Sequence, residues 1–230
     1  MSHFQFQTVA NIISGLGSIG ELKALLHAGG YKKLLLVTDG GIIQQQLHAP
    51  IIEILDTLQL HYVVYSKVQA DPPEHMVLDA VAFAQQQQID IVLGFGGGSS
   101  LDVAKIIAIL AHPQQQQGLQ DLYGMNQAKS PRLPLYLVPT TAGTGSEVTP
   151  ISIVTTGATS KTGIVAPILF ADVAILDATF TQNLPAHITA ATGIDAMVHA
   201  IEAYTSKIKK NPYADMLAKQ ALKLLDHNLS

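Results

Sequence analysis

Short apolar runs alternate with helical patterns along most of this chain. The apolar runs are rich in β-branched residues and predict strands at residues 4–9, 33–38, 62–66, 89–93, 135–138 and 173–176. Patterns typical of helices lie between several of them, at residues 18–28, 49–58, 73–88 and 100–111. This alternation predicts an α/β fold in which helices cover both faces of a parallel sheet.

Two later segments depart from the alternation. Residues 151–165, with Thr155-Thr156-Gly157-Ala158 in their middle, are typical of an inserted β-hairpin. After Leu184-Pro185 the pattern becomes helical, over residues 186–204 and 213–225. We therefore place a boundary near residues 177–185 and expect two domains, an α/β domain at 1–180 and a helical domain at 181–230.

Composition narrows the class of protein. The chain has 230 residues, of which 48% are hydrophobic and 13% charged, and its formal net charge is -4. A sizeable core is therefore expected, and no basic surface for nucleic acid or an anionic membrane. Without cysteine, metal ligands are limited to imidazole, carboxylate and water. No apolar run is long enough to span a membrane and no signal peptide is evident at the start, so we expect a cytoplasmic protein.

A glycine-rich turn follows the apolar run at 89–93. The sequence GFGGGSSLDVAK occupies residues 94–105 and opens the helical pattern that ends near Ala111. Glycines let backbone N–H groups approach an anion, and a helix N-terminus adds partial positive charge. The segment matches neither the P-loop nor the GxGxxG fingerprint. It predicts a phosphate site, the alternative being a turn whose glycines only ease packing.

A loop rich in hydroxyl groups follows the apolar run at 135–138. Its sequence is PTTAGTGSE, residues 139–147. Short hydroxyl donors at the end of a strand suit phosphate, ribose or amide groups, because open α/β sheets bind ligands at the carboxyl ends of their strands. An ordinary loop is the competing interpretation.

An aspartate and a histidine lie four residues apart in the helical segment GIDAMVHAIEAY, residues 193–204. This spacing directs Asp195 and His199 to one helix face, where both can bind a divalent cation. We expect the pair to lie at the edge of a core, beside a buried apolar stripe formed by Ile194, Met197, Val198 and Ile201. The spacing alone more often marks a solvated surface pair, so the metal interpretation depends on the two upstream motifs.

In this order, the three motifs resemble the iron-containing, or group III, alcohol dehydrogenases, and the resemblance runs from about Phe4 to the last residue. It implies a Rossmann-like NAD-binding domain followed by the start of an all-helical metal-binding domain. It also implies that Asp195 and His199 bind the catalytic metal, usually Fe(II) and in some relatives Zn. The residues it implies for NAD are Asp39, Gly96, Gly97, Gly98, Ser99, Ser100, Thr140, Thr141, Thr144 and Lys161.

Several of these roles have alternatives. Asp39 ends the strand at 33–38, where its carboxylate can accept from ribose hydroxyls and repel an NADP 2′-phosphate, or it can cap its own turn. For Lys161, the alternative interpretation is a solvated surface lysine. Asp102 is expected to support the helix start, with a cofactor contact as the alternative. Where the family often has an asparagine between prolines, this chain has Asp71 before Pro72-Pro73.

The resemblance predicts an NAD-dependent dehydrogenase that moves hydride between a primary alcohol or aldehyde and nicotinamide, and we expect a homo-oligomer. Family members are longer, and their two further histidine ligands match nothing in this chain, in which only His227 follows His199. The competing hypothesis is therefore a nucleotide-binding fragment or assembly module without turnover. Zinc-dependent relatives that act on glycerol or sugar phosphates fit residues 193–204 less well.

Overall fold

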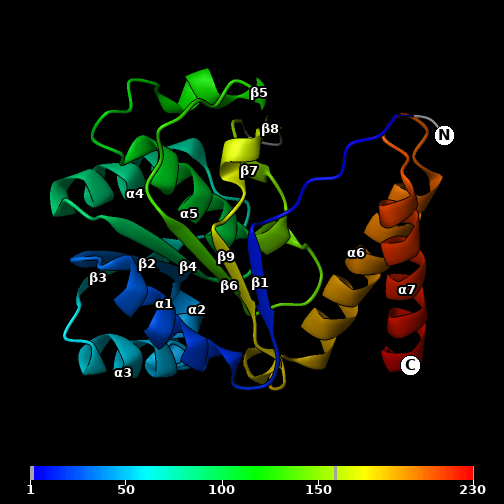
Figure 1. Cartoon of the computed structure of the whole chain (residues 1–230), viewed down its shortest axis with the longest axis horizontal. Helices are drawn as coiled ribbons and strands as arrows, with labels where there is room; N and C mark the ends of the chain where they lie inside the picture. Colours follow the sequence, from blue (N-terminus) through cyan, green and yellow to red (C-terminus); the bar gives the residue numbers. More distant parts are fainter. Residues whose placement is uncertain (1–2, 158–159, 230) are drawn as a thin grey trace.

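A six-stranded parallel sheet forms the centre of the molecule in this computed structural model, which describes residues 3–157 and 160–229 (Figure 1). From one edge to the other its strands are β1 (Asn11–Ser14), β9 (Val173–Leu176), β6 (Leu135–Pro139), β4 (Ile91–Gly96), β2 (Lys33–Asp39) and β3 (His61–Val68). Neighbouring strands end together, with Gly96 opposite Pro139 and Asp39 opposite Val68. The motifs that follow β2, β4 and β6 therefore meet at one edge of the sheet.

Helices cover both faces of this sheet, as the alternation predicted. Leu34 and Leu36 point into a core with α1 (Glu21–Gly29), α2 (Gly40–Gln44) and α3 (Ala49–Thr57). Leu35 and Val37 point into a second core, formed with α4 (Glu74–Gln87) and α5 (Gly98–Leu110). Successive side chains of a strand alternate between faces, so a continuously apolar strand such as β2 must be covered on both.

A smaller sheet packs beside α5. It contains β5 (Gly124–Met125), β8 (Lys161–Val165) and β7 (Ile151–Thr155), and β7 and β8 form the predicted antiparallel hairpin. The hairpin residue Ala158 lies outside the described residues. Five short 3-10 helices are found in the described connections, η1 (Ser18–Gly20), η2 (Leu119–Leu122), η3 (Ser146–Val148), η4 (Pro167–Leu169) and η5 (Ala178–Phe180).

Two helices at the end of the chain form an antiparallel hairpin beside the sheet domain (Figure 1). They are α6 (Ala186–Thr205) and α7 (Pro212–Asn228), close to the two predicted helical segments. The buried residues of these helices are small, namely Gly193, Ala200 and Ala218. Small side chains allow close helix packing, and a Cβ at Gly193 would lie 2.6 Å from side-chain atoms of Leu229.

The first predicted strand is wrong. Residues 4–9 are not in a strand, and the edge strand β1 begins at Asn11. The rings of Phe4 and Phe6 instead lie 5.9 Å and 5.5 Å from that of Tyr213 in α7, centroid to centroid. The pattern also missed α2 and β5, which are short. The division at 180/181 stays a prediction, and no helix in the described part of the chain is long and apolar enough to cross a membrane.

Candidate dinucleotide and metal site

The glycine-rich turn between β4 and α5 forms an open cradle. Gly96 has a φ of 147°, and a Cβ there would lie 2.8 Å from Oγ of Ser100, so this backbone path requires glycine. Gly97 is the N-cap of α5 and provides no side-chain cap. The first N–H groups of a helix have no intrahelical acceptor, so those of Gly98 and Ser99 can donate to an anion.

The predicted threonines lie against this cradle. Thr140 follows β6, is buried, and its backbone N–H donates to the carbonyl of Gly96 over 3.0 Å. A Cβ on Gly97 would lie 3.8 Å from Oγ1 of Thr141, and one on Gly98 would lie 3.1 Å from Oγ1 of Thr144. The fold therefore brings together the two loops that the sequence singled out, although their contacts to a cofactor stay predictions.

Asp39 lies at the same edge of the sheet, and its two carboxylate oxygens have different surroundings. Its Oδ1 accepts from the backbone N–H groups of Gly41 at 2.8 Å and Ile42 at 3.1 Å, which caps α2. Its Oδ2 lies 3.3 Å from the position that a Cβ on Gly96 would take. The capping alternative is thus present in the structure, and it leaves the second oxygen directed at the glycine turn.

A buried charge network joins α5 to the threonine loop and to β7. Nζ of Lys105, which is fully buried, donates to Oγ of Ser146 at 2.8 Å and to the carbonyl of Ile151 at 2.6 Å. The carboxylate of Asp102 lies 3.4 Å from Nζ and accepts from Oγ of Ser146 at 2.5 Å and from the N–H of Ile153 at 2.9 Å. Asp102 therefore supports the helix start by cross-linking it rather than by capping it.

Burial governs the ionisation of this network. It lowers the pKa of Lys105, against the pull of the neighbouring Asp102 and Glu147 carboxylates, and it raises the pKa of Glu147. The sequence interpretation missed the network. Its available signal was Lys105 itself, a single charge in the otherwise apolar stretch after Asp102, because a buried lysine requires a partner.

Lys161 lies at the start of β8, opposite Thr155 in the hairpin. Its Nζ forms an ion pair with Oδ1 of Asp71, 2.5 Å away, and both side chains are more than half exposed. The residue that departs from the family pattern is thus in contact with the lysine that the resemblance assigns to the cofactor.

Asp195 and His199 share one face of α6, as their spacing predicted. Nε2 of His199 lies 3.8 Å from Oδ1 of Asp195. Because each donor bonds a transition metal at about 2.1 Å, atoms at this separation can both reach one cation. Carboxylate oxygen and imidazole nitrogen suit iron(II) and zinc alike. The described residues contain no group of three or more potential ligands, and metal binding by this pair stays a prediction.

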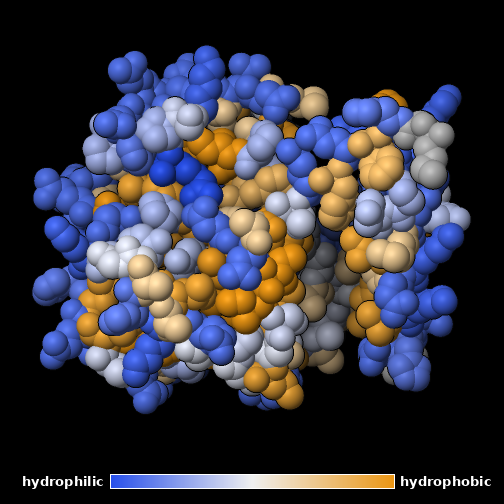
Figure 2. Space-filling view, in the orientation of Figure 1, coloured by the Kyte–Doolittle hydropathy of each residue, from blue (hydrophilic) through white to orange (hydrophobic). Residues whose placement is uncertain are grey.

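The expected buried stripe beside this pair is wrong. The side chains of Asp195 and His199 are 46% and 51% exposed, and Ile194, Val198 and Ile201 are exposed as well. The buried residues of α6 are the small Gly193 and Ala200, and Met197 of the expected stripe is half-buried. In the space-filling view the surface is hollowed between the sheet domain and the α6–α7 hairpin (Figure 2).

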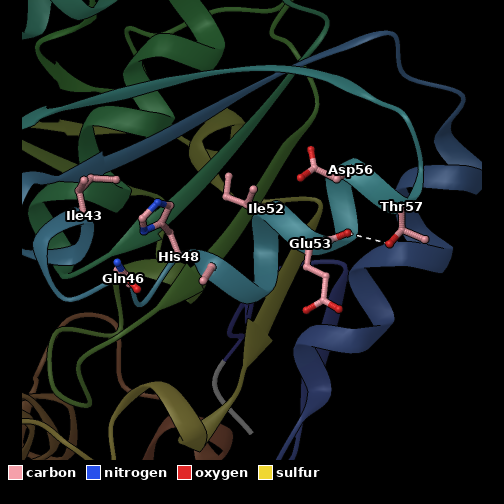
Figure 3. Close-up of a pocket in the computed structure, with 8 residues that line it drawn as sticks. Ile43, Gln46, His48, Ile52, Glu53, Asp56 and Thr57 are labelled. Atoms are coloured by element: carbon pink, nitrogen blue, oxygen red, sulfur yellow. Dashed lines mark hydrogen bonds between the residues drawn. The ribbon is translucent and has the colours of Figure 1, made fainter.

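An open depression of about 640 Å³ lies elsewhere, along α2 and α3. Figure 3 shows side chains that line it, among them His48, Glu53 and Asp56. Thr57 donates to the backbone carbonyl of Glu53 there. None of the residues predicted for cofactor or metal lines this depression, so we do not include it in the candidate site.

Comparison with known proteins agrees with this geometry. The family model described as iron-containing alcohol dehydrogenase matches residues 10–178, and that of the Fe-containing alcohol dehydrogenase family C-terminal region matches residues 189–230. The chain is 39% identical to long-chain-alcohol dehydrogenase 1 of Geobacillus thermodenitrificans over 94% of its own length and 54% of that protein.

Solved structures also superpose on this chain. A 1,3-propanediol oxidoreductase superposes with a TM-score of 0.93 at 34% identity, over 99% of this chain and 59% of the other. A sulfoacetaldehyde reductase from Bifidobacterium kashiwanohense in complex with NAD+ superposes with a TM-score of 0.88 at 29% identity, over 100% and 60%. The chain thus spans little more than half the length of these relatives. It belongs to the iron-containing alcohol dehydrogenase family.

Proposed function

We propose that this chain carries the cofactor-binding part and two metal ligands of an NAD-dependent alcohol dehydrogenase that exchanges hydride between a primary alcohol and nicotinamide. The observation that carries the proposal is the cradle at Gly96 to Ser100, where an uncapped helix N-terminus opens beside the threonine loop and Asp39. Family membership and the NAD+ bound to one structural relative support it.

Each part of the cradle has a distinct task. The N–H groups of Gly98 and Ser99 bind the pyrophosphate, where the helix dipole favours negative charge. Oδ2 of Asp39 accepts from a ribose hydroxyl, and its charge repels the 2′-phosphate of NADP. Thr140, Thr141 and Thr144 line the adenine and pyrophosphate region, and Lys161 donates to the nicotinamide ribose. These contacts orient the nicotinamide for transfer.

Asp195 and His199 are the two metal ligands of the proposal. They would hold iron(II), or zinc in its place, and the metal would supply a Lewis acid at the oxygen of the substrate. In the overall reaction the carbinol carbon would give a hydride to NAD+, and the hydroxyl proton would pass to solvent. The products are an aldehyde and NADH.

Cofactor binding is the first test. Fluorescence titration of the chain with NADH should show saturable binding, with NADPH binding more weakly. Gly98→Ala places a methyl group 3.0 Å from Cγ2 of Thr144 within the cradle and should raise the Kd for NADH about tenfold. Gly20→Ala is the matched control, because a Cβ there meets nothing within 4 Å. Equal loss of affinity in both variants, or no NADH binding, would refute the proposal.

Metal binding is the second test. Anaerobic titration with iron(II), and separately with zinc, should show binding by the unmodified chain that is abolished by Asp195→Ala and by His199→Ala. Oxidation of simple primary alcohols by the metal-loaded chain would then support turnover. A chain that binds NADH but neither retains metal nor oxidises alcohols would instead support the alternative of a nucleotide-binding module without turnover.

A further inference from the structure

The loop after β3 reaches the same edge of the sheet as the glycine cradle. Asp39 is opposite Val68 in the register of β2 and β3, and Asp71 is only three residues beyond Val68. Oδ2 of Asp39 in turn faces the turn at Gly96. Asp71 is therefore on the rim of the candidate dinucleotide site, at the position where the family often has a cofactor-contacting asparagine.

The backbone of Asp71 is held firmly in place. Its φ of 51° is in the left-handed region, which aspartate and asparagine tolerate better than most residues. Its carbonyl accepts from Oγ1 of Thr155 at 3.0 Å, and the carbonyl of Pro72 accepts from the N–H of Thr155 at 2.9 Å. Two prolines follow directly and restrict the loop further.

Lys161 comes from the other strand of the hairpin that contains Thr155. It is opposite Thr155 in the register, so the contacts that anchor Asp71 also bring Lys161 within reach. Its Nζ meets Oδ1 of Asp71 at 2.5 Å, and the two side chains are 52% and 68% exposed. An exposed pair of this kind stabilises a fold very little, so its consequence is the location of the ammonium group.

We propose that Asp71 is a positioning residue for Lys161, holding the ammonium group on the rim of the cradle before a dinucleotide arrives. An ammonium group has three N–H donors, and the pair with Asp71 uses one. Two remain for the hydroxyls of a ribose. A free lysine would lose its rotamer freedom only on binding, whereas the Asp71 pair restricts it beforehand. This inference rests on the proposed function of NAD binding.

A double-mutant cycle tests the proposal through NADH affinity rather than turnover. Asp71→Asn keeps the left-handed backbone and the side-chain shape but removes the charge, and we expect it to raise the Kd for NADH about threefold. Lys161→Gln should raise the Kd at least as much. The double variant should bind no more weakly than Lys161→Gln alone, because Asp71 acts only through Lys161.

Two further measurements separate positioning from a general structural effect. The difference between the unmodified chain and Asp71→Asn should shrink as ionic strength rises, because exposed charges are screened, and Asp71→Glu should restore part of the affinity. The matched control is Asp215→Asn, which removes the charge from a second lysine–aspartate pair, formed with Lys210 of the α6–α7 hairpin, and should leave NADH affinity unchanged.

The outcomes distinguish this inference from the function on which it rests. If the unmodified chain binds no NADH, the proposed function fails and the role of Asp71 fails with it. If the chain binds NADH but Asp71→Asn leaves the Kd unchanged or lowers it, only the positioning role is overturned. The same holds if Asp71→Asn weakens binding equally with and without Lys161.

Discussion

Gly143 in the threonine loop lies directly against Thr192 in α6. A Cβ on Gly143 would lie 2.6 Å from the carbonyl oxygen of Thr192 and 2.7 Å from its Cβ. Thr192 is three residues before Asp195 on the same helix. The absence of a side chain at Gly143 therefore sets how closely α6, which carries the predicted metal ligands, approaches the threonine loop.

Gly143→Ala should separate these two elements. Its methyl group meets a backbone carbonyl that cannot rotate away, so α6 or the loop must move, and overpacking of this kind typically costs 1–3 kcal/mol. We expect urea denaturation to show a loss of about 2 kcal/mol and NADH titration to show weaker binding. Gly20→Ala, whose added methyl group is in open space, should change neither. Unchanged stability and unchanged NADH affinity in Gly143→Ala would contradict this packing.

Substitutions can separate the capping role of Asp39 from its proposed role in cofactor binding. Asp39→Asn keeps an oxygen that can accept from Gly41 and Ile42 but removes the charge, so we expect little loss of stability and a gain in affinity for NADPH relative to NADH. Asp39→Ala removes the cap as well and should lose a further 1 kcal/mol or so of unfolding free energy. Parallel titrations with both cofactors and urea denaturation measure these effects. An unchanged cofactor preference in Asp39→Asn would leave Asp39 only its capping role.

Much of the fold could be predicted because local pattern and tertiary structure agree. The strands β2, β4, β6 and β9 are apolar runs bounded by turn residues, and their carboxyl ends must meet once the sheet is parallel. This places the glycine turn beside the threonine loop from sequence alone. The strand prediction for residues 4–9 failed because the rings of Phe4 and Phe6 pack on Tyr213 and the segment does not join the sheet.

The surroundings of Asp195 and His199 could not be predicted from periodicity. A helix with apolar residues at Ile194, Val198 and Ile201 implies a buried face, but periodicity does not say which chain segment buries it. Here the buried residues of α6 are the small Gly193 and Ala200 instead. The contact between Asp71 and Lys161 was likewise beyond sequence reasoning, because it joins residues 90 positions apart.

The Lys105 network should be strongly coupled. Lys105→Met removes a buried ammonium group and leaves Asp102 without its counterion, and breaking a buried pair typically costs 3–5 kcal/mol. We expect urea denaturation to show a loss of about 3 kcal/mol for this variant. The double variant Asp102→Asn/Lys105→Met should lose less than the sum of the two single losses, because with both charges removed no unpaired charge stays buried. Simple additivity would show that the pair contributes no coupling.

Asp177 should make stability depend on pH in the acid range. Its buried carboxylate accepts from the N–H groups of Gly17 at 3.0 Å, Ile19 at 2.9 Å and Thr179 at 3.0 Å, and from Oγ1 of Thr179 at 2.7 Å. Burial alone would raise the pKa of Asp177, but these hydrogen bonds outweigh it and the pKa is lowered. The folded state therefore favours the ionised form.

The stabilisation from Asp177 is complete above its unfolded pKa of 3.8 and is lost as pH falls through the lower folded value. Asp177→Asn should therefore be less stable than the unmodified chain by about 2 kcal/mol near neutral pH, with the difference narrowing below 3.8. Urea denaturation at a series of pH values measures this, with Asp226→Asn at an exposed position of α7 as the control. A difference that stays constant down to acid pH would show that the carboxylate charge is not what these donors stabilise.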